Sequence, residues 1–165
     1  MRVTLEEATP EDAAAIARLR NDVADRLTRQ HGKGHWSYAS SEYGILSGMK
    51  RSRVYVAWHD GRIIATLTLQ TKKPWAIDRS YFADVKTPVY LLSMAVDVES
   101  QGQGIGRQCV EQARAIAERW PADAIFLDAY DAKAGAGEFY RKCGFEEVGR
   151  VTYRGTPLIY FQLLL

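Results

Sequence analysis

The chain has 165 residues, of which 47% are hydrophobic and 25% are charged, and its 22 lysines and arginines nearly balance its 20 aspartates and glutamates. This composition predicts a single domain over residues 1–165 that buries a core without disulfide or metal crosslinks. It argues against secreted, membrane-spanning and nucleic-acid-binding classes, because no signal peptide, no long apolar stretch and no strong net charge is present. The two cysteines follow no disulfide or zinc spacing, so we expect a cytoplasmic protein that does not act at membranes.

The first half of the chain predicts strands and helices in alternation. Residues 3–7 alternate as a short strand does, and residues 9–29 begin with a Thr-Pro-Glu-Asp helix start. A weakly periodic segment follows and holds one short helix near residues 41–49. Residues 54–58 and 63–69 then form a hairpin around an Asp-Gly turn.

The second half continues with an apolar strand and further helix and strand patterns. The apolar run is typical of a strand that is buried on both faces. In chain order, we expect a strand at 89–96, a helix at 104–120, a strand at 124–129, a helix at 136–143, and two strands at 146–153 and 157–165. This order predicts a mixed α/β layer structure.

Charge is unevenly distributed along the chain. Residues 29–86 carry ten lysines and arginines against four aspartates and glutamates. Such a segment is either a solvated basic face or a surface that attracts an anionic ligand.

A glycine-rich loop lies between the apolar strand and the helix that follows it. The segment Gln101-Gly-Gln-Gly-Ile-Gly-Arg107 offers free backbone N–H groups at the positive end of a helix, which is a typical anion site. From Gly104 onward the first acidic residue is Glu111, so the helix start is open to an anion, although two acids lie just upstream. The spacing fits neither a dinucleotide fingerprint nor an NTP-binding loop. An ordinary tight turn remains the alternative.

Two motifs together resemble the GCN5-related N-acetyltransferase (GNAT) family. Gln101–Gly106 matches the family's Gln/Arg-x-x-Gly-x-Gly/Ala signature, and Phe139-Tyr140-Arg-Lys-Cys-Gly-Phe145 resembles its second landmark. The resemblance implies a GNAT-type central sheet that is mixed and mostly antiparallel. In such a sheet two parallel strands splay apart in a V, and helices flank it.

The resemblance also implies acetyl-CoA as the co-substrate. In the family, the loop holds the CoA pyrophosphate and the preceding strand pairs with the pantetheine arm. Lys133 stands where relatives commonly have asparagine, so it would meet a phosphate rather than the pantetheine. The implied acetyl-CoA-binding residues are Met94, Ala95, Val96, Gln101, Gly102, Gln103, Gly104, Ile105, Gly106, Arg107, Lys133 and Tyr140.

Acetyl transfer from a thioester to an amine needs a polarised carbonyl, a proton for the thiolate and a base. The resemblance implies that the backbone N–H of Val96 binds the carbonyl oxygen and that Tyr140 protonates the sulfur. Glu99 is our choice for the base, with Asp97 and Asp128 as alternatives. Asp128 lies within a predicted buried strand, where we expect it to pair with a neighbouring group.

Residues that select the acceptor come from the variable segments of such a fold. The candidates are His35, Trp36, Tyr38, Trp75 and Tyr81. Aromatic side chains of this kind also serve as core packing, which is the alternative reading. The histidines show no paired ligand spacing, so we expect no metal.

The sequence therefore predicts an acetyl-CoA-dependent N-acetyltransferase acting by direct attack of a primary amine on the thioester. The amine would belong to a small molecule or to a peptide or protein. Alternatives are a non-catalytic acyl-CoA-binding sensor, a different acyl-CoA, or a hydroxyl acceptor. We expect a monomer or a homodimer. The sequence leaves open the acceptor, the acyl length, the base and the pathway.

Overall fold

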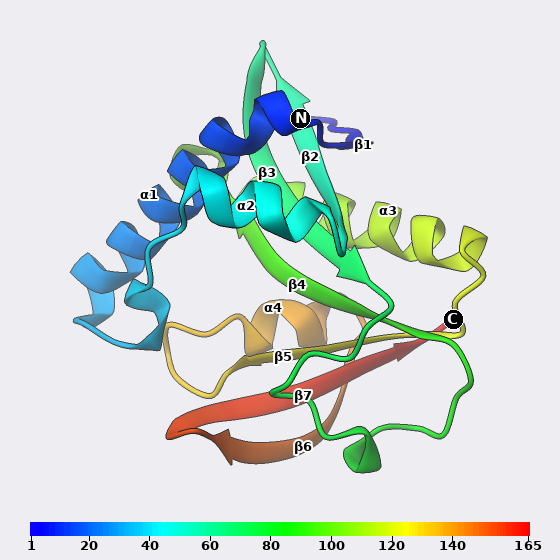
Figure 1. Ribbon diagram of the computed structural model, residues 1–165. Coiled ribbons are helices and arrows are strands. Elements are labelled where there is room, and N and C mark those ends of the chain that lie inside the picture. The colour runs from blue at the N-terminus through cyan, green and yellow to red at the C-terminus, as the bar shows by residue number, and fades with distance from the viewer. The chain divides into compact units, whose positions relative to one another are not determined.

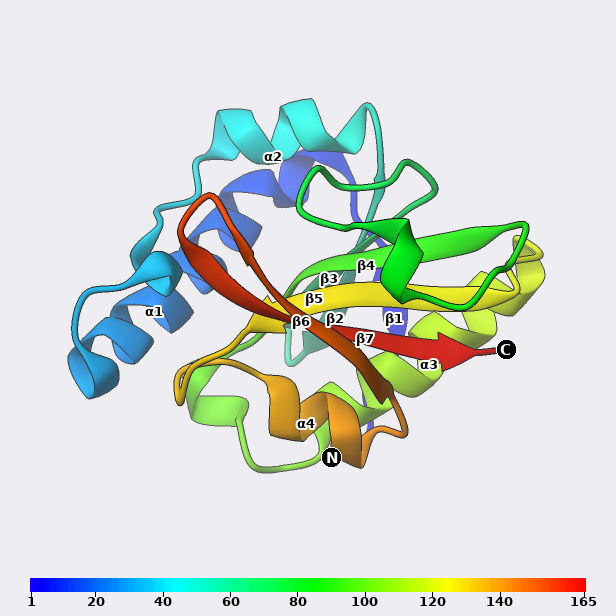
Figure 2. The same cartoon turned by 90° about the horizontal axis from the view of Figure 1, so that it is seen from below.

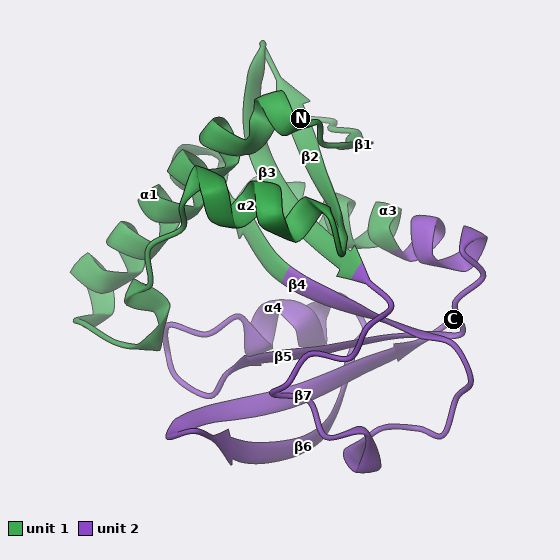
Figure 3. Cartoon of the chain, viewed as in Figure 1, with its two compact units in different colours: residues 1–69, 93–113 green, residues 70–92, 114–165 purple.

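A computed structural model describes residues 1–165. The chain divides into two compact units, which Figure 3 shows in different colours. The first unit contains residues 1–69 and 93–113, and the second contains residues 70–92 and 114–165. Strand β4 and helix α3 each contribute residues to both units.

The first unit contains two complete strands, nearly all of a third, and two complete helices, which are labelled in Figure 1. They are β1 (Leu5–Glu7), α1 (Ala13–His31), α2 (Glu42–Met49), β2 (Arg53–His59) and β3 (Arg62–Gln70), with β3 passing into the second unit at its last residue. The unit also holds the C-terminal part of β4 (Pro88–Val96) and the first part of α3 (Ile105–Arg119).

The second unit contains three complete strands and one short helix. They are β5 (Ala124–Tyr130), α4 (Gly137–Lys142), β6 (Glu146–Tyr153) and β7 (Thr156–Leu164). The N-terminal part of β4 and the long segment before it belong to the same unit.

The strands follow the order β1-β2-β3-β4-β5-β7-β6. β4 and β5 form the one parallel pair, and their register covers three residues on each strand, Pro88–Tyr90 with Ala124–Phe126. The pairing ends there although both strands continue. A mixed sheet with one parallel pair and flanking helices confirms the predicted fold class.

The core of the first unit lies between α1 and the β2–β3 hairpin. Ile16 and Leu19 of α1 are buried against Val54 and Val56 of β2. Figure 2 shows α1 and α2 on one side of these strands and α3 on the other. From Arg20 onward α1 has no fully buried residue, so the C-terminal half of the helix is only partly covered.

The core of the second unit is rich in aromatic side chains. Phe82 stacks on Phe126 with ring centroids 4.3 Å apart, and Tyr90 and Tyr160 belong to the same cluster. The segment before β4 thus covers one face of β5 and β7. α4 lies on the other face, where Gly137 approaches Phe161.

The predicted elements agree with the structure within a few residues at each end. The chief difference is at the start of the first helix, where Pro10–Asp12 form a 3₁₀ turn that leads into α1. The backbone N–H of Thr9 donates to the Asp12 carboxylate at 2.8 Å, so the predicted start signal is used. No helix has both the length and the apolar character that a membrane crossing requires.

Candidate functional site

The glycine-rich loop is an exposed turn that leads into α3. Gly102 and Gly104 both have φ of +78°, a left-handed conformation that other residues adopt only with strain. The first turn of α3 contains no acidic residue. Helix geometry leaves the N–H groups of Ile105, Gly106 and Arg107 without partners inside the helix. The loop therefore presents unpaired donors at a positive helix end, as an anion site requires.

At the C-terminal end of β4, one backbone N–H group points away from the neighbouring strand β3. The N–H of Asp97 donates to the carbonyl of Ile64 in β3 at 2.7 Å. Because successive N–H groups of an extended strand point to opposite sides, the N–H of Val96 points away from β3. The Gln101 side chain donates to the Val96 carbonyl at 3.0 Å, which ties the loop to the strand end.

Two of the three candidate bases, Asp97 and Glu99, lie in the first unit, and their carboxylates have different contacts. The Asp97 carboxylate is held by Arg62 at 3.1 Å and by the Ser100 hydroxyl at 3.2 Å, and its side chain is 15% exposed. Glu99 is exposed, and its carboxylate makes no hydrogen bond or ion pair. Asp97 thus fixes the turn after β4, whereas Glu99 has an unoccupied carboxylate.

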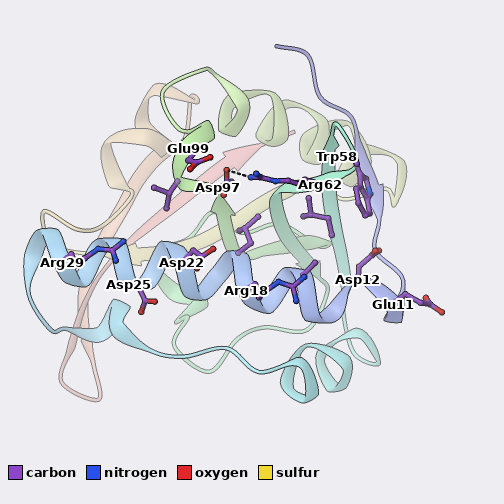
Figure 4. A pocket seen from close by; sticks show the side chains of 15 residues that line it. Glu11, Asp12, Arg18, Asp22, Asp25, Arg29, Trp58, Arg62, Asp97 and Glu99 are labelled. Atoms are coloured by element: carbon purple, nitrogen blue, oxygen red, sulfur yellow. Dashed lines mark hydrogen bonds and ion pairs between the residues drawn. The ribbon is translucent and has the colours of Figure 1, made fainter.

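Glu99 lines a groove of about 700 Å³ between α1, the turn of the β2–β3 hairpin and the segment after β4. Figure 4 shows Asp22 on α1 and Asp97 and Glu99 on the segment beside it, with Arg62 reaching Asp97. Six carboxylate and three arginine side chains line the groove. Its excess of negative charge favours a cationic group such as a protonated amine.

Tyr140 is buried in the second unit by an aromatic cluster. Its ring contacts Phe139, Phe145 and Phe161 at centroid distances of 5.2, 5.5 and 6.1 Å. The hydroxyl makes no hydrogen bond. Burial, with smaller contributions from Cys143 and Asp128, raises the pKa of Tyr140 far above its ordinary value. The phenol is therefore protonated at neutral pH and can act as a donor.

Asp128 and Lys133 belong to the second unit as well. Burial raises the pKa of Asp128. The expectation that Asp128 pairs with a neighbouring group is wrong, because its carboxylate has no ion pair or hydrogen bond; the register of β5 and β7 places it opposite Tyr160. Lys133 is exposed in the loop before α4.

The acceptor candidates fall into two groups. His35 and Trp36 form a 3₁₀ turn after α1, where the Trp36 indole donates to the Gly32 carbonyl at 3.0 Å, and Tyr38 just beyond is 84% exposed. In the second unit, Trp75 and Tyr81 line one pocket of about 410 Å³ together with Tyr153 and Tyr160. Nothing in either group marks a metal site, since no cluster of three or more potential ligands is present.

One polar side chain of the first unit was missed by the sequence reasoning. Arg20 lies on the core-facing side of α1, one turn after Ile16, and its Nε is buried without a hydrogen-bond partner. Its spacing from Ile16 and Leu19 is the signal that could have found it, because these positions place an arginine on the buried stripe. Ser93 was also missed: it has φ of +52° within β4, a strained conformation for a residue with a side chain.

The family of the chain is shown by comparison with known sequences. Residues 50–147 match the family model of the acetyltransferase (GNAT) domain, and this chain belongs to that family. The N-acetyltransferase YesJ of Bacillus subtilis (strain 168), itself uncharacterized, is 27% identical over 147 residues, which cover 86% of this chain and 81% of YesJ.

Solved structures with the same fold are also found. A GNAT-family acetyltransferase from Listeria monocytogenes aligns with a TM-score of 0.76 at 18% identity, covering 99% of this chain and 95% of that one. The structure of yncA from Salmonella typhimurium with its cofactor acetyl-CoA aligns with a TM-score of 0.72 at 19% identity, covering 99% and 94%. At these identities the likeness shows the GNAT fold.

Proposed function

We propose that this chain is an acetyl-CoA-dependent N-acetyltransferase that transfers the acetyl group directly to a primary amine. The observation that carries the proposal is the glycine-rich loop, with two left-handed glycines and a helix start free of acids. Family membership and the acetyl-CoA in the yncA structure support the choice of donor. In this proposal the loop N–H groups from Gln101 to Arg107 bind the pyrophosphate.

The end of β4 polarises the thioester. The N–H of Val96 donates to the carbonyl oxygen as negative charge develops there, and Met94 and Ala95 pair with the pantetheine arm. The Gln101 bond to the Val96 carbonyl supports this role, because it fixes the strand end that carries the donor.

Tyr140 acts on the leaving thiolate. An ordinary thiol has a pKa of about 8.5, and the raised pKa of Tyr140 makes full proton transfer uphill. The phenol therefore stabilises the thiolate first as a hydrogen-bond donor. Tyr140→Phe is expected to lower kcat at least about tenfold and to leave the Kd for acetyl-CoA unchanged. CoA release and isothermal titration measure the two quantities.

A matched control for this variant is Tyr90→Phe, which removes another buried hydroxyl from the second unit. It should retain the wild-type kcat. Wild-type turnover in Tyr140→Phe would eliminate the proposed role, and an equal loss in both variants would point to general damage to the fold.

Glu99 is the proposed base, and Asp128 is retained as the second candidate because burial raises its pKa toward the range of a general base. Glu99→Gln should lower kcat/KM about tenfold near neutral pH, with a smaller loss at high pH, where the amine loses its proton to solvent. Asp128→Asn makes the same chemical change at the other candidate. Profiles of kcat/KM against pH identify the base as the residue whose amide variant shows the loss.

Two other readings make different predictions in the same assay. A sensor would be stabilised by acetyl-CoA but would release no CoA with any amine, and an O-acyltransferase would release CoA with alcohols. For the compartment we propose the cytoplasm, a choice supported by the two cysteines, Cys109 and Cys143, which form no disulfide.

A further inference from the structure

We propose that Arg20 binds the carboxylate of the acceptor, so that the substrates are small amines that also carry a carboxylate, amino acids above all. The inference rests on the proposed acetyl transfer and adds the class of acceptor to it. Its basis is an arginine of the first unit whose Nε is buried without a hydrogen-bond partner and which makes no ion pair.

Arg20 lies on the side of α1 whose other residues are apolar and pack against β2 and β3. Ile16 and Ala13, which lie on the same side of the helix one and two turns earlier, are fully buried. The Arg20 guanidinium contacts β3, where Nη2 donates to the Thr68 hydroxyl at 3.4 Å. This distance is at the long end of the hydrogen-bond range.

No carboxylate compensates this charge. Arg20 makes no ion pair, and its Nε is the one buried side-chain nitrogen or oxygen atom of the protein without a hydrogen-bond partner. Burial lowers the pKa of Arg20, which reflects the cost of desolvating the cation. Because a partly buried charge without a counter-ion costs free energy, a ligand that supplies the missing anion would account for its presence here.

The part of α1 beyond Arg20 is less covered than the part before it. Beyond Arg20 the apolar residues Val23 and Leu27 of α1 are only half-buried. Carboxylate suits the site better than phosphate, because one guanidinium balances a single negative charge and its planar fork matches two oxygens.

Arg20 contacts β3, the strand next to β4, whose C-terminal end is proposed to bind the thioester. β3 and β4 are antiparallel, and the Asp97 N–H bonds to the Ile64 carbonyl. Thr68, the residue that Arg20 contacts, belongs to β3, the strand next to β4. Ser93 is exposed, directly precedes Met94, and has the strained φ of +52°. A carboxylate on Arg20 therefore lies next to the strand that presents the acetyl group.

The test compares amino acids with their neutral amides. A panel of L-amino acids and linear ω-amino acids, each with its amide, is assayed for CoA release with the wild type and Arg20→Met. For the preferred acceptor, the wild type should favour the acid in kcat/KM by about 30-fold or more. Arg20→Met should lose this preference, with the loss appearing as a higher KM for the acid. Arg20→Lys, which keeps the charge but not the fork, should retain part of the preference.

Folding is monitored separately. Arg20→Met should have a Tm at least equal to that of the wild type, because it removes an unpaired buried charge and keeps the apolar stem. Arg26→Met, on the same helix, is the matched control and should keep the wild-type preference. A large fall in the Tm of Arg20→Met would make Arg20 a structural residue and overturn the inference.

Binding without turnover distinguishes this inference from the proposed function. In the presence of CoA, an acid of the panel should raise the Tm of the wild type but not of Arg20→Met. If that shift occurs without CoA release, carboxylate binding by Arg20 is supported and the proposed acetyl transfer is contradicted. Equal use of acids and amides by both proteins leaves acetyl transfer intact and overturns the inference. A loss of acetyl-CoA affinity in Arg20→Met, with no effect of acids, would assign Arg20 to the CoA phosphates and also overturn it.

Discussion

The glycine-rich loop and Arg20 belong to the same unit, and each is suited to an anion, but they are built in opposite ways. The loop uses backbone N–H groups at an exposed helix start, with φ of +78° at two glycines. Arg20 uses a side chain that α1 buries against β3. A backbone site depends on conformation and little on nearby charge, whereas a side-chain site depends on the charge itself and on how deeply it is buried.

The largest effect is expected from a change of conformation in the loop. Gly104→Val places a β-branched residue at φ of +78°, which valine adopts only at high cost, so the loop must rearrange. The affinity for acetyl-CoA should fall about 100-fold, since several N–H donors lose their alignment together. Isothermal titration with acetyl-CoA measures this loss.

Gly32→Val is the control for backbone strain. Gly32 has φ of +80° at the end of α1, outside the loop. Both variants should lose thermal stability, but only Gly104→Val should lose acetyl-CoA affinity. Wild-type affinity in Gly104→Val would show that the loop does not bind the pyrophosphate.

The loop could be recognised from sequence because its conformation depends on residue type. The glycines at 102 and 104 have left-handed backbone conformations. A Cβ atom added at either position would have no other atom within 4 Å, so the conformation and not the available space favours glycine there. The hairpin at Asp60 and Gly61 was predictable for the same reason, since both residues have positive φ. Local backbone geometry of this kind is determined by the types of a few neighbouring residues.

The environment of Arg20 could not be predicted with the same ease. Its missing partner becomes evident only when Thr68, forty-eight positions away, is brought against α1 without a carboxylate nearby. The unpaired state of Asp128 was mispredicted for the same reason, because a charge in a strand is usually compensated by partners that the sequence does not locate. Tyr140 was identified through its motif, but its aromatic surroundings come from Phe161, far along the chain.

An intermediate effect is expected from Asp128, the second lone charge, which lies in the other unit. Its pKa is raised by burial, so the folded state holds this proton more tightly than the unfolded state does. The stability that this proton provides is full below 3.8, the ordinary pKa of an aspartate, and is lost as the pH rises through the higher pKa of the folded state. Asp128→Asn does not titrate. It should therefore raise the Tm near pH 7 by about 3 °C.

The gain in Asp128→Asn should shrink steadily as the pH is lowered toward the pKa of the unfolded carboxyl. Thermal melts of both proteins between about pH 4 and pH 8 measure the difference. A gain that is constant over this range would mean that Asp128 is not an uncompensated buried carboxylate. Its resemblance to Arg20 as a lone charge would then be lost.

The smallest effect is expected from the one cationic side chain in the loop motif. Arg107 is exposed and pairs with Glu111 at 3.4 Å, with both side chains about two-thirds exposed. Such a group is strongly screened by water and salt. Arg107→Met should therefore weaken acetyl-CoA binding only about threefold, and raising the salt concentration should remove most of the difference from the wild type. A loss as large as that of Gly104→Val would show that the pyrophosphate is held by side-chain charge, and the contrast between the loop and Arg20 would disappear.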